Sequence, residues 1–375
     1  MEKEVEKCIN MIRRGYTKEK IRAVFKWKNF EDIYEVAKCR IRAKNKFSVK
    51  SLYFDTYGLR YSTPEIVAEY RAKRIQNKKI ADISCGVGLQ AIFYSFKNKR
   101  VLCVDINKKR IEYAKKNAIA YKANNIDFLI GDALSDEIKN RVAEYDVIFS
   151  DPARDESEPE RSLETLLPSP IKIIEKYGQR DYIFDLPPQI ALHKIPKDWE
   201  KEFISLNGKI IRFTAYVGKL KIHDRVAVSL PENHVLWSDL PPQHLNYKKL
   251  AINKIKLSNN IYIVGESIYY AKLLNEFKDR YHIQYLQIGK RRTLATGDGD
   301  IPFTKKFKVL CKSTNLSEII ECMKSEGIGK VTLRFAISPE EYWSLRTKLE
   351  NALRGELKGS LFHVGDVWIG ATNVT

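Results

Sequence analysis

The sequence predicts an α/β protein with a doubly wound, mostly parallel sheet, and two observations carry that prediction. Between about residues 46 and 250, short apolar runs alternate with amphipathic stretches, as strands do with the helices that connect them. The first of these runs ends in an acidic residue and a turn with two glycines, which is typical of ligand-binding sheets of this kind. Residues 1–45 and 255–375 follow other patterns, so each is expected to form a domain of its own.

The first 45 residues are expected to form a small basic module of short helices. Apolar residues recur at helical spacing on two faces, separated by the segment RGYTKEK. They are Val5, Ile9, Ile12, Ile21, Val24 and Phe25. Lysines and arginines are spread through the segment from Arg13 to Lys44.

The α/β domain is expected to begin with a helix in STPEIVAEYRAKRI, with Thr63 as its N-cap and Pro64 in the first helical position. Strands are expected at residues 79–84, 100–106, 126–131, 145–151, 181–187, 209–217 and 225–230. A helix at 108–123 separates the second strand from the third. Because a short connection joins the last two strands, they are expected to pair antiparallel at one edge.

The C-terminal segment mixes strands and helices without a regular alternation, which predicts an α+β domain. Its strands are expected at 260–265, 282–289, 306–311, 330–337 and 360–372, and its helices at 316–327 and 338–355.

The charge balance favours a polyanionic partner. Lysine and arginine (66) exceed aspartate and glutamate (47), so the formal net charge is +19. Nucleic acid bound through its phosphates explains this excess more simply than a lysine-rich surface of thermophilic type, in which glutamate would keep pace. No apolar run approaches the roughly 20 residues that span a bilayer, and the N-terminus lacks the apolar centre of a signal peptide. A cytoplasmic protein without a membrane partner is expected.

The cysteines and histidines indicate neither a disulfide framework nor a zinc site. The 6 cysteines are scattered without a Cys-x-x-Cys pair, and the 6 histidines lie far from them in sequence. Most of the cysteines are expected to be buried apolar side chains, and no metal is expected to be required.

Four acidic residues at the ends of successive strands predict a ligand site. They are Asp82, Asp105, Asp132 and Asp151. Strand ends meet at one edge of an open parallel sheet, where the second acid can accept hydrogen bonds from both ribose hydroxyls and the third can reach an adenine amino group. Gly86 and Gly88 let the backbone approach a ligand that a Cβ would hit. The dinucleotide fingerprint is not met, because Ser84 replaces its first glycine, and the P-loop lysine is missing. Aspartates also cap helices and strand ends for structural reasons, but four in order beside a glycine turn favour a site.

With these motifs the chain resembles the class I, Rossmann-like, S-adenosylmethionine-dependent methyltransferases. From YSTPEIVAEY to DPAR it is similar to the trimethylguanosine synthase branch, the RNA cap guanine-N2 methyltransferases, which carry a Thr-Pro-Glu helix start before an Asp-x-x-Cys-Gly-x-Gly loop. The resemblance implies S-adenosylmethionine as the cofactor. The implied contacts are Asp82, Gly86 and Gly88 for the methionine end, Asp105 for the ribose, Asp132 for the adenine, Thr63 closing over the cofactor, and Cys85, Ile106 and Ala133 as further neighbours.

The segment SDPAR at 150–154 predicts a catalytic loop. Methyl transfer is an in-line displacement, so the protein mainly aligns the nucleophile and excludes water. Asp151 and the carbonyl of Ser150 or Pro152 can accept the two N–H bonds of a base amino group, and Pro152 stiffens the turn. A ring nitrogen such as guanine N7 needs no such acceptor, so the motif leaves the methylated atom open.

The two residues after the Asp-Pro pair depart from the family pattern. Related enzymes carry proline and an aromatic residue there, whereas this chain has Ala153 and Arg154. Stacking on an aromatic ring is worth about 1–3 kcal/mol per base, and a guanidinium can supply part of it and contact a phosphate. This favours an internal nucleotide over a cap, while an ion pair within DESEPE is the equal alternative for Arg154. Asp185, in FDLPPQ at the end of the next strand, could line the base pocket or belong to a plain turn.

The segment from YLQIGKRRTL to VWIGATNV is similar to the THUMP-like domain of some archaeal and bacterial methyltransferases, which implies RNA binding. Lys290, Arg291 and Arg292, together with Lys305 and Lys306, surround a glycine-containing loop and suit phosphates. Solvated surface charge is the alternative for these residues.

The sequence thus predicts a cytoplasmic, monomeric, archaeal-type RNA N-methyltransferase. Its expected target is a purine, guanosine at N2 or N7, in structured tRNA or rRNA. A protein methyltransferase, a DNA adenine methyltransferase and a non-catalytic RNA-binding protein with the same fold are the alternatives.

Overall fold

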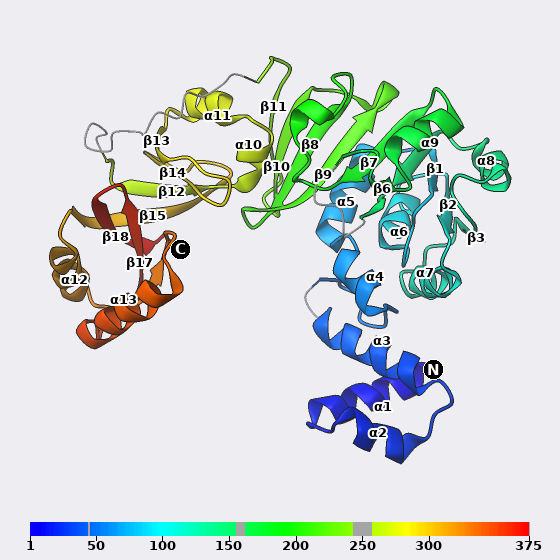
Figure 1. Cartoon of the computed structure of the whole chain (residues 1–375), viewed down its shortest axis with the longest axis horizontal. Coiled ribbons are helices and arrows are strands. Elements are labelled where there is room, and N and C mark those ends of the chain that lie inside the picture. Colours follow the sequence, from blue (N-terminus) through cyan, green and yellow to red (C-terminus); the bar gives the residue numbers. More distant parts are fainter. Residues whose placement is uncertain (44–45, 155–161, 243–256, 375) are drawn as a thin grey trace. The chain divides into compact units, whose positions relative to one another are not determined.

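The computed structural model describes residues 1–43, 46–154, 162–242 and 257–374 (Figure 1). Contacts between Cα atoms divide the chain into two compact units. The first comprises Met1–Glu200 and Phe213–Ile222, and the second comprises Lys201–Arg212 and His223–Thr375. The expected domain limits near residues 45 and 250 lie inside these units and stay predictions.

The N-terminal segment is helical, as predicted. Its helices are α1 (Glu2–Arg13), α2 (Lys18–Phe25) and α3 (Phe30–Arg42), followed by α4 (Thr56–Tyr61) and α5 (Glu65–Arg74). The apolar faces of α1, α2 and α3 lie in one buried cluster that also contains Val87, Leu89 and Tyr113. These three helices therefore share a hydrophobic core with the glycine turn and the helix that follows the second strand.

Asn117 joins the N-terminal segment to the glycine turn through three hydrogen bonds. This residue of α7 (Lys108–Ala120) is completely buried. Its side-chain oxygen accepts the N–H of Tyr53 at 2.7 Å, and its amide donates to the carbonyl oxygens of Tyr53 at 3.1 Å and Val87 at 2.9 Å. Buried backbone groups need such partners, so this one side chain fixes two segments against each other.

The start of α5 differs from the prediction by one residue. The helix begins at Glu65, so Pro64 is its N-cap residue and Thr63 precedes the cap. No side chain caps the first turn, and the prediction of a Thr63 cap was therefore wrong. Thr63 is buried in the connection between α4 and α5.

A nine-stranded sheet has the order β11-β10-β8-β9-β7-β4-β1-β2-β3 (Figure 1). In the first unit the strands are β1 (Lys79–Asp82), β2 (Arg100–Asp105), β3 (Ile126–Ile130), β4 (Val147–Ser150) and β7 (Asp181–Leu186), with part of β9 (Lys209–Val217). The first five are parallel to their neighbours, and β9 runs antiparallel to β7. Helices α6 (Leu89–Ser95), α8 (Asp136–Val142) and α9 (Pro170–Tyr177) complete this unit with α7. The chain passes from β1 outward to β2 and β3 and then returns to β4 on the other side of β1, which makes β1 and β4 the switch point of the sheet.

The predicted antiparallel edge was wrong because two strands were missed. Strand β8 (Glu200–Leu206) stands between β9 and β10 (Arg225–Leu230) in the sheet order and pairs parallel with β10. The antiparallel partner of β10 is β11 (His234–Ser238). The predicted alternation of strands and helices, and the parallel centre of the sheet, are confirmed.

The second unit contains a seven-stranded sheet with the order β13-β14-β12-β15-β18-β17-β16. Its strands are β12 (Asn260–Val264), β13 (Gln284–Gln287), β14 (Thr293–Gly297), β15 (Thr304–Ser313), β16 (Ile328–Leu333), β17 (Leu357–Val364) and β18 (Val367–Asn373). Its helices are α10 (Glu266–Tyr270), α11 (Leu274–Tyr281), α12 (Leu316–Ser325) and α13 (Pro339–Ala352). Only the β16–β17 pair is parallel among the described strands of this sheet. The α+β prediction is confirmed.

The cysteines depart from the prediction at one pair. Cys311 on β15 and Cys322 on α12 are disulfide-bonded, with their Cα atoms 6.6 Å apart. This pair could not be predicted from the sequence, because the contact depends on α12 packing against β15. Cys8, Cys39 and Cys103 are free and buried, as expected, and Cys85 is free and half-buried.

The described residues were also compared with the requirements of a metal site and of a membrane-spanning helix. Within them, no three His, Cys, Asp or Glu side chains are grouped so that they could hold a metal ion. Every helix in those ranges is too short or too polar to span a bilayer.

Replacing Asn117 by alanine is expected to destabilise the protein, because it leaves buried backbone groups of Tyr53 and Val87 without partners. The expected loss is about 1–3 kcal/mol in the free energy of unfolding, measured by urea denaturation. Asn124 is exposed in the loop between α7 and β3, and Asn124→Ala is the matched control. Equal losses in the two variants would contradict the role of the Asn117 amide.

Candidate active site

The acidic residues predicted at strand ends lie along one edge of the parallel sheet. Asp82 and Asp105 are the last residues of β1 and β2, and Asp151 follows the last residue of β4. Asp132 lies two residues after β3. Since β3, β2, β1 and β4 are neighbours and parallel, the structure brings these four positions to the same edge, at the switch point.

The glycine turn between β1 and α6 needs both of its glycines, for different reasons. Gly86 and Gly88 have φ angles of +53° and +82°, which side chains rarely allow. A Cβ on Gly88 would lie 2.9 Å from the Cβ of Ala114, whereas a Cβ on Gly86 would meet nothing within 4 Å. Gly88 is therefore required by packing against α7, while Gly86 faces open space that a ligand could fill.

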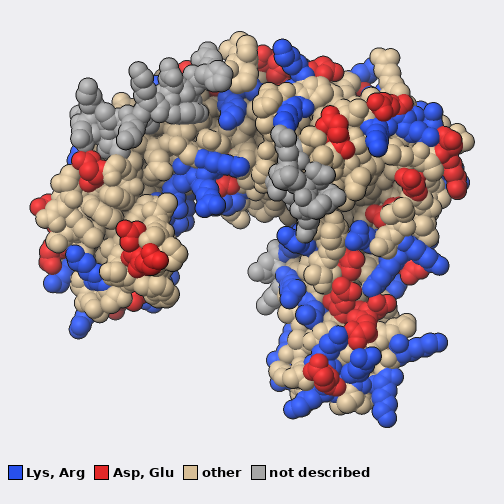
Figure 2. Space-filling model, viewed as in Figure 1, with Lys and Arg blue, Asp and Glu red and all other residues tan. Residues whose placement is uncertain are grey.

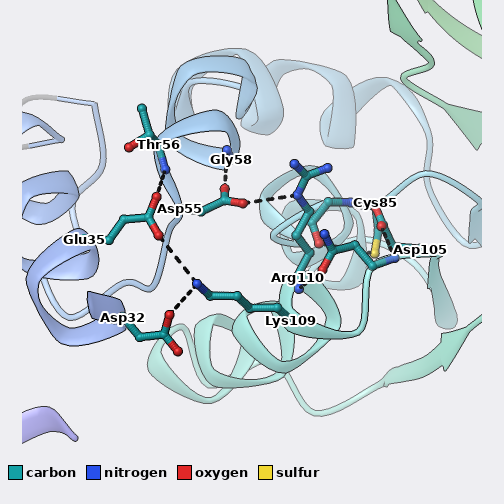
Figure 3. Close-up of polar contacts among 11 residues, drawn as sticks. Asp32, Glu35, Asp55, Thr56, Gly58, Cys85, Asp105, Lys109 and Arg110 are labelled. Atoms are coloured by element: carbon teal, nitrogen blue, oxygen red, sulfur yellow. Dashed lines mark hydrogen bonds and ion pairs between the residues drawn. The ribbon is translucent and has the colours of Figure 1, made fainter. Parts of the chain in front are cut away.

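The Asp105 carboxylate is held by two backbone N–H groups. One oxygen accepts from Gly86 at 2.9 Å and the other from Asn107 at 2.8 Å. Figure 3 shows Asp105 beside Cys85 of the glycine turn. The end of β2 and the turn after β1 are thereby fixed to each other, which places the carboxylate at the mouth of the turn.

Asp82 is a buried carboxylate in an acidic neighbourhood. It is 1% exposed, and one oxygen accepts the N–H of Ser84 at 3.2 Å. Burial raises the pKa of Asp82 well above its ordinary value, the Ser84 N–H opposes this rise, and the charges of Asp151, Asp105 and Asp185 add to it. Because negative charges converge here, a positively charged ligand group would be stabilised beside Asp82.

Ser84 fixes the start of the predicted catalytic loop. Its hydroxyl oxygen accepts the N–H of Asp151 at 2.7 Å and lies 3.2 Å from the hydroxyl of Ser150. The sequence argument noted Ser84 only as a departure from a glycine motif and missed this role. The Asp-x-Ser spacing at the end of β1 was the available signal.

Ile106, Asp132 and Ala133 form the outer part of this edge. Ile106 is 76% exposed directly after Asp105, so its apolar surface is available to cover a flat ring. One oxygen of Asp132 accepts the N–H of Leu134 at 2.9 Å. The carbonyl of Ala133 accepts the hydroxyl of Tyr177, and burial, helped by the charge of Asp132, raises the pKa of Tyr177 to about 12.

The Asp-Pro loop continues into a short strand. Pro152 is buried, and β5 (Ala153–Arg154) pairs antiparallel with β6 (Leu166–Leu167). The Arg154 side chain and the acidic residues 155–161 lie outside the described residues. A substrate contact and an ion pair both stay predictions for Arg154.

Asp185 lies within β7, one residue before its end, and is 3% exposed. It forms an ion pair with Arg71, which is fully buried and also donates to Thr214 at 2.7 Å and to Gln90 at 3.1 Å. The structure thus gives Asp185 a structural partner that the sequence argument missed. A substrate contact for Asp185 stays a prediction.

The N-terminal helices contact the site through α4 and the first turn of α7 (Figure 3). A Cβ added to Gly58 would lie 2.8 Å from a methyl carbon of Val87 in the glycine turn, so α4 packs directly on that turn. Asp55 caps α4 through the Gly58 N–H and lies 3.5 Å from Nε of Arg110, whose guanidinium is 4.5 Å from the ring centre of Tyr57. The sequence missed this contact because the residues are far apart along the chain.

A second link in Figure 3 joins α3 to α7. Lys109 forms ion pairs with Asp32 at 2.6 Å and Glu35 at 3.5 Å, and Glu35 also accepts the N–H of Thr56. These groups are partly exposed, so each ion pair contributes modestly, but together they hold α3 against the start of α7.

The basic residues predicted to bind substrate lie in the second unit, between β13 and β14. Lys290 and Arg291 are exposed, and Arg292 is half-buried. Substrate binding by these three residues stays a prediction.

Comparisons with known proteins agree on the fold. A family model described as RNA cap guanine-N2 methyltransferase matches residues 77–155. An uncharacterized RNA methyltransferase of Clostridium tetani is 35% identical over 77 residues, which are 20% of this chain and 17% of that protein. The chain therefore spans about a sixth of that curated relative. The crystal structure of a putative methyltransferase from Porphyromonas gingivalis superposes over 100% of this chain and 99% of its own, with a TM-score of 0.70 and 14% identity. The fold is that of the class I, Rossmann-like methyltransferases.

Alanine at the two turn glycines is expected to separate the cost of packing from the cost of the backbone conformation. Gly88→Ala combines a left-handed backbone, which costs about 1–2 kcal/mol, with a clash against Ala114. Gly86→Ala carries only the backbone cost. In urea unfolding, Gly88→Ala should lose clearly more stability than Gly86→Ala; the opposite order would contradict the packing argument.

The stability of the ligand-free protein is expected to fall with rising pH because of Asp82. A carboxyl whose folded-state pKa is raised contributes stability that is fully present below its ordinary pKa of about 4 and is lost as pH rises through the raised value. Asp82→Asn cannot ionise, so its advantage over the wild type should grow from about pH 5 to about pH 8 in urea unfolding. A difference that is independent of pH would show that Asp82 has an ordinary pKa.

Proposed function

We propose that this chain is an S-adenosylmethionine-dependent methyltransferase that acts on RNA. The observation that carries the proposal is the set of strand-end carboxylates around the glycine turn, within the segment 77–155 that matches the RNA cap guanine-N2 methyltransferase model. The methyltransferase fold of the whole chain and its net charge of +19 support it.

The residues at the sheet edge fit the cofactor. S-adenosylmethionine carries a sulfonium and an ammonium group, and the acidic neighbourhood of Asp82 suits such charges. Asp105, oriented by two N–H groups, would accept the ribose hydroxyls, and Asp132 would reach the adenine amino group. Cys85, Gly86, Gly88, Ile106, Ala133 and Thr63 are the remaining proposed contacts.

Asp151 is the proposed catalytic residue. When bound, the cofactor would supply a methyl group on a sulfonium sulfur. An amino nitrogen aligned opposite the C–S bond would bond to the methyl carbon as that bond breaks, leaving a neutral thioether, and one proton of the nitrogen would pass to Asp151 or solvent. The Asp151 carboxylate and the carbonyl of Ser150 or Pro152 would accept the N–H bonds of that nitrogen and orient its lone pair. Ser84, which holds the backbone of Asp151, is a positioning residue in this scheme.

The finer proposal for the substrate is a purine, guanosine, in structured tRNA or rRNA. Ala153 and Arg154 stand where cap-modifying relatives carry a proline and a stacking aromatic, which favours an internal nucleotide that is unpaired or flipped out.

The decisive experiment supplies labelled S-adenosylmethionine with total RNA, with duplex DNA and with protein as acceptors. RNA should be labelled, and mass spectrometry of its nucleosides would name the base and the nitrogen. If only protein or only DNA is labelled, that acceptor and not RNA is the substrate class. If the protein fails to bind S-adenosylmethionine in calorimetry, the hypothesis that it is a methyltransferase is rejected.

Asp151→Ala is expected to abolish methyl transfer while S-adenosylmethionine binding is largely kept, because the carboxylate faces the acceptor in the proposed scheme. Single-turnover assays with RNA should show a loss of at least about 100-fold. Ser84→Ala should retain more activity, since it removes only a positioning contact. Unchanged transfer by Asp151→Ala would remove this residue from the mechanism.

A further inference from the structure

Two cations of the second unit lie against one buried aromatic ring. Phe307, on β15, is 0% exposed. The guanidinium carbon of Arg334, which follows β16, lies 5.5 Å from the centre of the Phe307 ring, and Nζ of Lys305 lies 5.6 Å from it. These cations belong to segments that are distant in sequence, so the folded sheet brings them together.

Arg292 adds a third positive charge to this neighbourhood. It directly precedes Thr293, which pairs with Val264, and Val264 pairs on its other side with Thr304, the residue before Lys305. Burial lowers the pKa of Arg292, and the charge of Arg334 lowers it further. Burial also lowers the pKa of Arg334. Both guanidinium groups are therefore half-removed from water, and they repel each other.

The described residues supply no carboxylate that forms an ion pair with Arg292, Lys305 or Arg334. The contrast on the same strand is clear, because Lys306 is paired with Asp300 at 2.9 Å. Successive strand residues point to opposite faces, so Lys305 and Lys306 face different surroundings. Lys305 is exposed, whereas Arg292 and Arg334 are half-buried. Half-buried cations that lack an anion are costly, and an external anion would offset that cost.

The Arg334 side chain is held in place. Its Nε donates to the hydroxyl of the buried Ser360 at 3.5 Å, and its backbone N–H donates to the carbonyl of Leu361 at 2.7 Å. The Phe307 ring beneath it limits its freedom further. A guanidinium fixed in this way loses little entropy when it binds a phosphate through two parallel hydrogen bonds.

We propose that Arg292, Lys305 and Arg334 form a phosphate-binding site that holds the phosphodiester backbone of the RNA substrate. The RNA part of this inference rests on the proposed function. Figure 2 shows lysine and arginine atoms gathered on one face of this unit. The site extends the expectation from sequence, since it adds Arg334 and distinguishes Arg292 from the exposed Lys290 and Arg291.

The test measures binding of a fluorescein-labelled RNA hairpin to the full chain by anisotropy. Arg292→Ala and Arg334→Ala should each weaken binding by about tenfold and reduce the slope of log Kd against log salt by about 0.7–0.9. Lys308→Ala is the matched control, because Lys308 is an exposed cation on the same strand. Arg334→Lys keeps the charge without the planar fork and should recover part of the loss.

Two readouts separate this inference from the proposed function. S-adenosylmethionine binding, measured by calorimetry, should be unchanged in every variant. If the wild type methylates RNA while Arg292→Ala and Arg334→Ala bind the hairpin normally, the phosphate site is overturned and the function stands. If the arginine variants lose RNA binding but the wild type never methylates RNA, the site stands and the function falls.

Competition with inorganic pyrophosphate and with ATP identifies the source of the phosphate. Weak competition, at millimolar concentration, is expected for an RNA site. The RNA assignment would be overturned if either compound bound tightly, the arginine variants abolished that binding, and hairpin binding stayed unchanged.

Arg334→Gln replaces Arg334→Ala if the alanine variant fails to fold, as judged by circular dichroism.

Discussion

The buried ion pair between Arg71 and Asp185 is the interaction on which the active-site edge of the sheet depends. The parallel strands end at this edge, which brings several carboxylates close together. Their negative charges disfavour the ionisation of Asp82 and so raise its pKa. Arg71, on α5, neutralises the charge of Asp185 and also donates a hydrogen bond to Thr214 on β9. The edge can therefore stay acidic enough for a cationic ligand without the strands being forced apart.

The parallel half of the fold could be predicted because its signals are local. Apolar strands ending in aspartate, and glycines at positive φ, follow from residues that stand next to each other. Strand β8 was missed because its sequence, EKEFISL, places charged residues in a buried strand, where Glu200 pairs with Arg74. The charged residues suggested an exposed segment, so the strand was not predicted and the edge pairing was assigned to the wrong strands.

The candidate site was predictable only as far as its strand ends. The positions of Asp82, Asp105 and Asp151 followed from their place after apolar runs. The partners that hold them, such as Ser84, and the contact of α4 with the glycine turn depend on tertiary packing over long sequence separations. The Cys311–Cys322 pair was invisible for the same reason.

The shared core of the N-terminal helices and the glycine turn has a thermodynamic consequence. Because Val87 and Leu89 pack among α1–α3 and Asn117 ties Tyr53 to that turn, a ligand that stabilises the folded turn also stabilises the packing of the helices. Linkage is reciprocal, so a molecule that bound these helices and altered their packing would change the ligand affinity of the turn by the same free energy.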